Sequence, residues 1–152
     1  MSVETTNTEA PTADRRAGRM RLLGAAMVLT LLGQLLLGMA NTFWLSLPDS
    51  GSGWNVASPA LLLTAHMTLG TALLVLSVWI AVLAVRLRDR GWVVASVVGI
   101  AAILVSFTGG SLFMGETSND GASYLMAVGC AVAIAAYALA LYRVAQPPRT
   151  AV

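Results

Sequence analysis

Four long stretches of the chain contain no charged residue, and polar segments separate them. The stretches are residues 22–45, 61–85, 92–114 and 122–142. Each is long enough to cross a bilayer as a helix, which takes about 20 apolar residues. Polar and apolar residues do not alternate within them, so the pattern excludes membrane-spanning β-strands. We expect an all-α protein with four transmembrane helices.

The segments that join the stretches set the expected order of the helices. The link between the second and third stretches is very short, so we expect those helices to be antiparallel neighbours in an up-down four-helix bundle. This membrane domain is predicted to cover residues 20–144. The polar segment 1–19 is predicted to be a disordered tail, and residues 145–152 form a second, short tail.

The charges predict how the bundle is oriented in the membrane. All nine basic residues are arginines, and none lies in segments 46–60 or 115–121. Because positive residues remain on the cytoplasmic side, both termini and the link between the second and third stretches are predicted to be cytoplasmic. Trp44, Trp92 and Tyr142 lie at ends of stretches, where aromatic residues anchor helices at the membrane interface.

The composition narrows the class of protein further. Hydrophobic residues make up 57% of the chain and charged residues 11%, whereas soluble domains carry about 25% charged residues. The lipid bilayer is therefore the first expected partner, and nucleic acid is not expected, because the arginines lie in short loops and tails. The absence of lysine, with many Ala, Val and Leu residues, indicates a high-GC bacterial source and hence the bacterial cytoplasmic (inner) membrane.

Small and weakly polar residues recur at helical spacing and predict the faces that pack together. One such stripe lies in each stretch: Thr30, Gln34, Gly38 and Asn41; His66, Gly70, Leu73 and Ser77; Ser96, Gly99, Ile103, Ser106 and Gly110; Ser123, Met126, Cys130, Ala133 and Tyr137. A further face of small residues, Gly129, Ala133, Ala136 and Ala140, is either a surface for a partner protein or an internal seam.

His66 is the only histidine of the chain and lies within the second stretch. Because an ionisable residue is costly to place inside a membrane, its presence there indicates a functional role unless another explanation is found. His66 could tie helices together through hydrogen bonds, ligate haem iron, or titrate in a proton relay; the relay lacks further ionisable groups in the stretches. The polar or packing cluster predicted around His66 comprises Gln34, Asn41, Gly70, Ser111 and Tyr124.

The succession QLLLGMANTFW and then AHMTLGTALLVL resembles one four-helix half of the haem A synthase family. In that family a Gln-x-x-x-Gly helix precedes a helix with a haem-ligating histidine, and Gln34, Gly38 and His66 match by type and order. The chain has SYLM at residues 123–126, where the family places a second axial histidine, and LLT at residues 62–64, where it has a glutamate. The resemblance therefore implies a related fold and argues against haem A synthesis.

No catalytic residues are predicted. The chain has no Cys/His cluster for zinc or iron–sulfur and no oriented carboxylate for a catalytic triad. From the sequence we favour a non-enzymatic accessory or self-associating subunit of a membrane complex, such as a respiratory one, without a cofactor. The alternative is a b-type haem protein that transfers electrons, with His66 as one axial ligand and either Met126 or the His66 of a second copy as the other.

Overall fold

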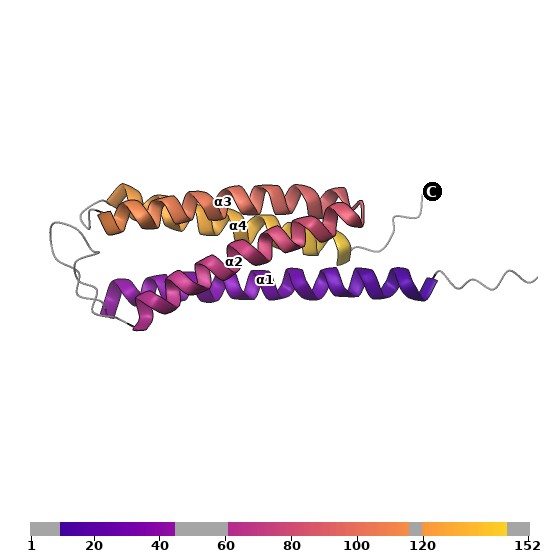
Figure 1. Ribbon diagram of the computed structural model, residues 1–152, viewed down its shortest axis with the longest axis horizontal. Coiled ribbons are helices and arrows are strands. Elements are labelled where there is room, and N and C mark those ends of the chain that lie inside the picture. The colour runs from indigo at the N-terminus through magenta and orange to yellow at the C-terminus, as the bar shows by residue number, and fades with distance from the viewer. Residues whose placement is uncertain (1–9, 45–60, 116–119, 146–152) are drawn as a thin grey trace, which may run out of the picture.

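The computed structural model consists of four long helices (Figure 1). They are α1 (Ala10–Trp44), α2 (Leu61–Arg86), α3 (Arg90–Gly115) and α4 (Asp120–Ala145). The structure describes residues 10–44, 61–115 and 120–145, and within these ranges it contains no strand. Each helix includes a segment long and apolar enough to cross a membrane. The predicted all-α four-helix bundle is confirmed, and the chain is a multi-pass membrane protein.

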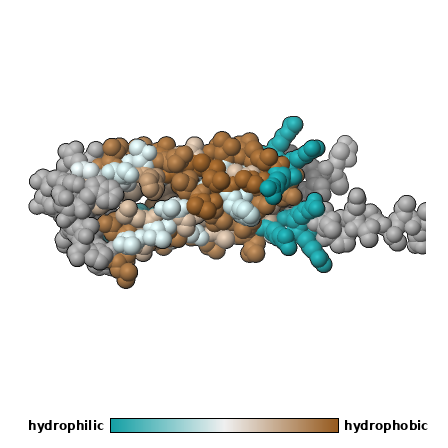
Figure 2. Space-filling view, in the orientation of Figure 1, coloured by the Kyte–Doolittle hydropathy of each residue, from teal (hydrophilic) through white to brown (hydrophobic). Residues whose placement is uncertain are grey.

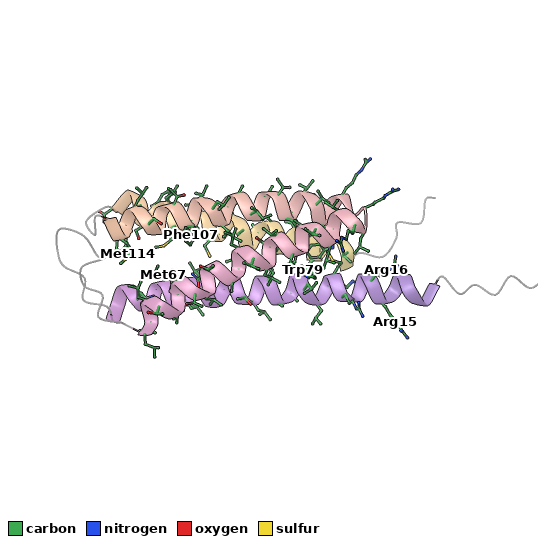
Figure 3. All side chains as sticks on the ribbon, in the orientation of Figure 1. Arg15, Arg16, Met67, Trp79, Phe107 and Met114 are labelled. Atoms are coloured by element: carbon green, nitrogen blue, oxygen red, sulfur yellow. The ribbon has the colours of Figure 1, made fainter. Side chains whose placement is uncertain are left out.

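The arginines of the described residues gather at one end of the bundle. Figure 2 shows them as a hydrophilic group next to a long hydrophobic belt, and Figure 3 labels two of them, Arg15 and Arg16, on α1. We call this end the inner end, because the sequence predicts it to be cytoplasmic, and the opposite end the outer end.

Helix α1 is longer than its apolar stretch. It begins at Ala10, whereas the apolar stretch begins at residue 22, and its membrane-spanning part covers Gly18–Asn41. Pro11 is its second residue, where the missing N–H of proline costs no helical hydrogen bond, and the alanines and arginines that follow favour a helix. Residues 10–19 are therefore helical rather than part of a disordered tail; residues 1–9 lie outside the described part.

A tight turn connects α2 to α3 at the inner end. Asp89 N donates to Ala84 O at 3.0 Å and Arg88 N donates to Val85 O at 3.0 Å, which is the pair of bonds of a Schellman motif. Arg88 occupies the left-handed position, with φ at 55°. The Asp89 carboxylate then accepts a hydrogen bond from Trp92 N at 3.2 Å and caps the start of α3. The two helices are thereby held antiparallel.

Trp92 does not face the lipid, whereas its place at the end of a stretch predicts an anchor exposed at the membrane interface. It is only 1% exposed, and its indole ring lies so close to Gly24 of α1 that a Cβ on that glycine would overlap the ring. Tyr142, in contrast, is exposed, as an interfacial anchor should be. The side chain of Trp44 lies outside the described part.

Helices α3 and α4 approach each other backbone to backbone. A Cβ on Gly129 would lie 2.6 Å from Ala102 O, and a Cβ on Gly109 would lie 2.8 Å from Ala122 O. Ala133 is fully buried and Ala140 is 4% exposed. The small-residue face of α4 is therefore an internal seam, and it is not available as a surface for a partner protein.

Helix α2 crosses the bundle obliquely, so that it begins against α1 and ends beside α3 (Figure 1). At its beginning, Leu62 O accepts a hydrogen bond from Asn41 Nδ2 of α1 at 3.3 Å. At its end, the tight turn leads directly into α3. The helices consequently fill the inner half of the bundle and leave a cavity between them in the outer half.

Candidate functional site

The cavity in the outer half has a volume of about 560 Å³, and all four helices line it. Small-molecule pockets have volumes of roughly 300–1,000 Å³. Most of its walls are apolar side chains: Leu31, Leu35, Met39, Leu63, Met67, Leu73, Ile103, Phe107, Phe113, Met114 and Met126. Polar groups are few: Gln34, Asn41 and His66 lie on the wall formed by α1 and α2, and three serines, Ser106, Ser111 and Ser123, lie on α3 and α4.

Exposed side chains of α2 and α3 line the cavity, and from them we infer an opening toward the lipid between these two helices. Met67 of α2 and Phe107 of α3 both line it, although they are 41% and 49% exposed. Figure 3 labels both side chains in the outer half of the bundle, on these two helices. A hydrophobic molecule dissolved in the membrane could therefore reach the cavity without passing through water.

The cavity ends near the middle of the bundle. Leu73 and Ile103 line its inner part and are almost completely buried. Further toward the inner end, Ile80, Trp92 and Tyr137 are at most 1% exposed and fill the core. Among the described residues the cavity is thus a pocket with a closed inner end, rather than a passage across the membrane.

Reciprocal contacts between α1 and α2 build the polar wall. Gln34 Nε2 donates to the backbone O of His66 at 3.0 Å and lies 3.3 Å from His66 Nε2. A Cβ on Gly70 would lie 3.1 Å from Gln34 Nε2, and one on Gly38 would lie 3.1 Å from His66 Cε1. Each helix therefore carries one long polar side chain and, four residues later, the glycine against which the opposite side chain packs.

Asn41 adds a third tie between the two helices, closer to the outer end. Its Nδ2 donates to Leu37 O at 3.1 Å and to Leu62 O at 3.3 Å. The side chain is 9% exposed. Because both partners are carbonyl oxygens, the NH₂ group of Asn41 must face them, and its buried Oδ1 has no partner among the described residues.

Three buried polar atoms of this wall have no hydrogen-bond partner among the described residues. They are Gln34 Oε1, Asn41 Oδ1 and His66 Nδ1. Because Gln34 Nε2 is a donor, we assign the acceptor lone pair to His66 Nε2 and the proton to Nδ1 of a neutral ring. A buried polar group without a partner costs about 1–3 kcal/mol. The polar wall is therefore incomplete on its own.

The structure brings together most of the polar cluster predicted from the sequence. Gln34, Asn41 and Gly70 meet His66 or its neighbours on the same wall, and Ser111 lines the cavity from α3, with its hydroxyl bonded to Phe107 O at 3.0 Å. Tyr124 does not belong to the cluster, because it is 72% exposed and does not line the cavity.

Met126, the predicted second haem ligand, lines the same cavity as His66. Its sulfur packs toward α3, where a Cβ on Gly110 would lie 3.4 Å from Sδ. Its backbone O accepts a hydrogen bond from Ser106 Oγ at 2.6 Å. The two residues therefore line one cavity, but the contacts described here place the nitrogens of His66 against α1.

Cys130 also lines the cavity, although the sequence suggested only a packing role for it. It is the single cysteine of the chain, it is 7% exposed, and its Sγ lies 3.7 Å from Leu31 O of α1. In the sequence, only the stripe that Cys130 shares with Met126 indicates that it lies on the same face as a cavity residue. Among the described residues, no group of three or more His, Cys, Asp or Glu residues could hold a metal ion.

No family model, no curated protein and no solved structure matches this chain. The resemblance to haem A synthase therefore stays a prediction that rests on Gln34, Gly38 and His66.

Proposed function

We propose that the protein is a non-enzymatic membrane protein that binds one largely apolar small molecule in the outer cavity. The observation that carries this proposal is the cavity of about 560 Å³ with apolar walls from all four helices. Atoms that line an empty space forfeit their dispersion contacts, and an apolar molecule restores them. The few polar groups among the lining residues would fix the orientation of the molecule, as they do in most small-molecule sites.

The place of the opening supports a ligand that comes from the lipid phase. Met67 and Phe107 flank the opening between α2 and α3. Methionine is flexible and adapts to different apolar partners, so this side chain can move aside as the molecule enters. The closed inner end argues for binding and against transport across the membrane.

The proposal is tested by filling the cavity. Gly110 lines the cavity, and a Cβ there would make only ordinary contact, 3.4 Å from Met126 Sδ, so we expect Gly110→Leu to fold and to occupy the space. Gly33→Leu is the matched control, because nothing lies within 4 Å of a Cβ at Gly33. Both variants replace a helical glycine with the same side chain.

The measurement is a titration of the protein in nanodiscs with the fluorescent probe N-phenyl-1-naphthylamine, with empty nanodiscs as the blank. We expect saturable binding of one probe per wild-type protein and per Gly33→Leu protein, and binding at least about tenfold weaker in Gly110→Leu. Fluorescence that never exceeds the blank would overturn the proposal, as would equal binding by all three proteins.

Haem b is a second candidate for the bound molecule, and the shared location of His66 and Met126 on one cavity favours it. This pair of side chains is a known ligand set for haem iron. Haem ligation also needs His66 Nε2 to be released from Gln34 and Nδ1–H to find an acceptor, and the described residues give it none. The two side chains therefore match a known pair of haem ligands in type. No described residue, however, would hold the histidine ring in place through Nδ1.

Absorption spectra of the purified protein distinguish this candidate. A haem-binding role predicts a Soret band at close to one haem per protein, which is lost in His66→Ala. A colourless protein after expression with added haem would eliminate haem and leave the broader proposal intact.

The function favoured from the sequence, an accessory subunit of a membrane complex, is compatible with ligand binding. The binding experiment does not depend on a partner, because all four helices that line the cavity belong to one chain. A partner protein and self-association both stay predictions.

A further inference from the structure

Arginines from all four helices lie where the hydrophobic belt stops at the inner end (Figure 2). Arg86 and Arg90 are the inner limits of the spans of α2 and α3, and Arg19 and Arg143 lie one residue from the inner limits of the spans of α1 and α4. All four side chains are exposed. We call these four residues the arginine collar. Because the collar follows the edge of the apolar spans, it lies at the level of the lipid headgroups.

Within the described part of the chain, the charge of the collar has no partner. No hydrogen bond or ion pair joins a collar side chain to another described residue. Asp89 is the one acidic residue at this end whose side chain the structure describes, and its carboxylate accepts a hydrogen bond from Trp92 N at 3.2 Å. Arg21 is not part of the collar, because its Nη2 donates to Val144 O at 2.7 Å. Four guanidinium groups therefore stand ready for an anion from outside the described chain.

We propose that the arginine collar binds the phosphate groups of anionic phospholipids in the leaflet at the inner end. A guanidinium group forms paired hydrogen bonds with phosphate oxygens, and an anionic membrane surface attracts basic residues close to the ends of spans. A zwitterionic lipid carries its own cation beside the phosphate, so it competes less well. The inference does not depend on the proposed function, because the collar and the outer cavity lie at opposite ends of the bundle.

The level of the collar favours a lipid headgroup over a free phosphate ion. The four arginines lie at the edge of the belt and not beyond it, so headgroups of lipids that pack against the helices reach them from the side. Acyl chains hold a lipid phosphate at this level, whereas nothing holds a free ion there. Tyr142, the neighbour of Arg143, is also exposed, and exposed aromatic residues at the ends of spans lie among the headgroups.

Native mass spectrometry tests the preference for anionic lipid. The protein in a non-ionic detergent is titrated with phosphatidylglycerol or with phosphatidylcholine of the same acyl chains, and the ratio of the two affinities is compared between proteins. The test variant combines Arg19→Gln, Arg86→Gln, Arg90→Gln and Arg143→Gln. We expect the wild-type protein to prefer phosphatidylglycerol by about tenfold or more, and the glutamine variant to prefer it by about twofold or less.

Two variants serve as controls. Lysine at the same four positions keeps the charge and removes the planar fork, so this variant should keep at least about half of the wild-type ratio; a loss as large as in the glutamine variant would overturn the assignment to charge. Gly110→Leu, at the outer cavity, should keep the full ratio. If Gly110→Leu loses the preference and the glutamine variant keeps it, the lipid binds in the cavity and the collar inference is wrong.

The remaining outcomes decide the source of the phosphate and the role of the collar. Millimolar inorganic phosphate should leave the occupancy by phosphatidylglycerol unchanged; displacement would show a site for the free ion and overturn the choice of a lipid. Equal affinity of the wild-type protein for both lipids, or an unchanged ratio in the glutamine variant, would also overturn the inference. If the glutamine variant fails to fold, the pairs Arg19→Gln with Arg143→Gln and Arg86→Gln with Arg90→Gln replace it, and each should lower the ratio.

Discussion

Replacing Gly129 with alanine should destabilise the bundle, because this glycine allows α3 and α4 to touch. A Cβ at this position would lie 2.6 Å from Ala102 O and 2.8 Å from Ser106 N. Carbon–oxygen contacts between helices normally have separations of about 3.3–3.6 Å. The two helices must therefore move apart by about 0.7 Å or more at this position.

The size of the effect follows from three contributions. Forcing an extra carbon into a packed interior costs about 1–3 kcal/mol. Separation of the helices also lengthens the hydrogen bond from Ser106 Oγ to Met126 O, now 2.6 Å, and a lost hydrogen bond costs about 1 kcal/mol. The higher helix propensity of alanine returns at most about 1 kcal/mol. We expect a net loss of about 1–3 kcal/mol in the free energy of unfolding.

The assay is unfolding in mixed micelles by titration with dodecyl sulfate, followed by far-ultraviolet circular dichroism. Gly33→Ala is the matched control, because nothing lies within 4 Å of a Cβ at that position, and it should be neutral or slightly stabilising. If Gly129→Ala unfolds at the same detergent fraction as Gly33→Ala, the backbone contact between α3 and α4 is not the one described here.

Three further predictions use other features of the fold. Trp92→Ala should cost about 3–5 kcal/mol of unfolding free energy in the same titration, because the side chain is 1% exposed. Trp79→Ala, at a residue that is 58% exposed, should change the unfolding free energy by no more than about 0.5 kcal/mol. Similar losses in the two variants would contradict the packing. Arg88→Gly should stabilise the protein by about 0.5 kcal/mol, since Arg88 has a φ of 55° and glycine adopts such angles without strain; a loss of stability would contradict the turn. Alkaline phosphatase fused after Gly115 should be active and after Arg88 inactive, as the arginines predict; the reverse pattern would show the opposite orientation.

The sequence predicts the four helices and their inward faces well. Uninterrupted apolar stretches leave a helix as the only way to satisfy backbone hydrogen bonds in lipid, so the four spans need no tertiary information. Helical spacing likewise places residues on a face, and the predicted stripes contain Ser77, Ser96 and Tyr137, all fully buried. Gln34 and His66 were recognised because polar groups are rare in such stretches.

The features that depend on contacts between helices could not be predicted. Trp92 lies at the end of its stretch, and only the space left by Gly24 on another helix explains its burial. Tyr124 belongs to the polar cluster predicted from the sequence, but it is 72% exposed and does not line the cavity. The cavity itself depends on the oblique path of α2 (Figure 1), and no periodicity within one helix specifies a crossing angle.

The central claim is that the outer cavity holds one small apolar molecule, and native mass spectrometry of the protein released from its own membrane tests it most directly. We expect the wild-type protein and Gly33→Leu to carry one bound small molecule that is distinct from the bulk phospholipids, and Gly110→Leu to carry none. A wild-type protein without a bound molecule, or equal occupancy in Gly110→Leu, would contradict the account.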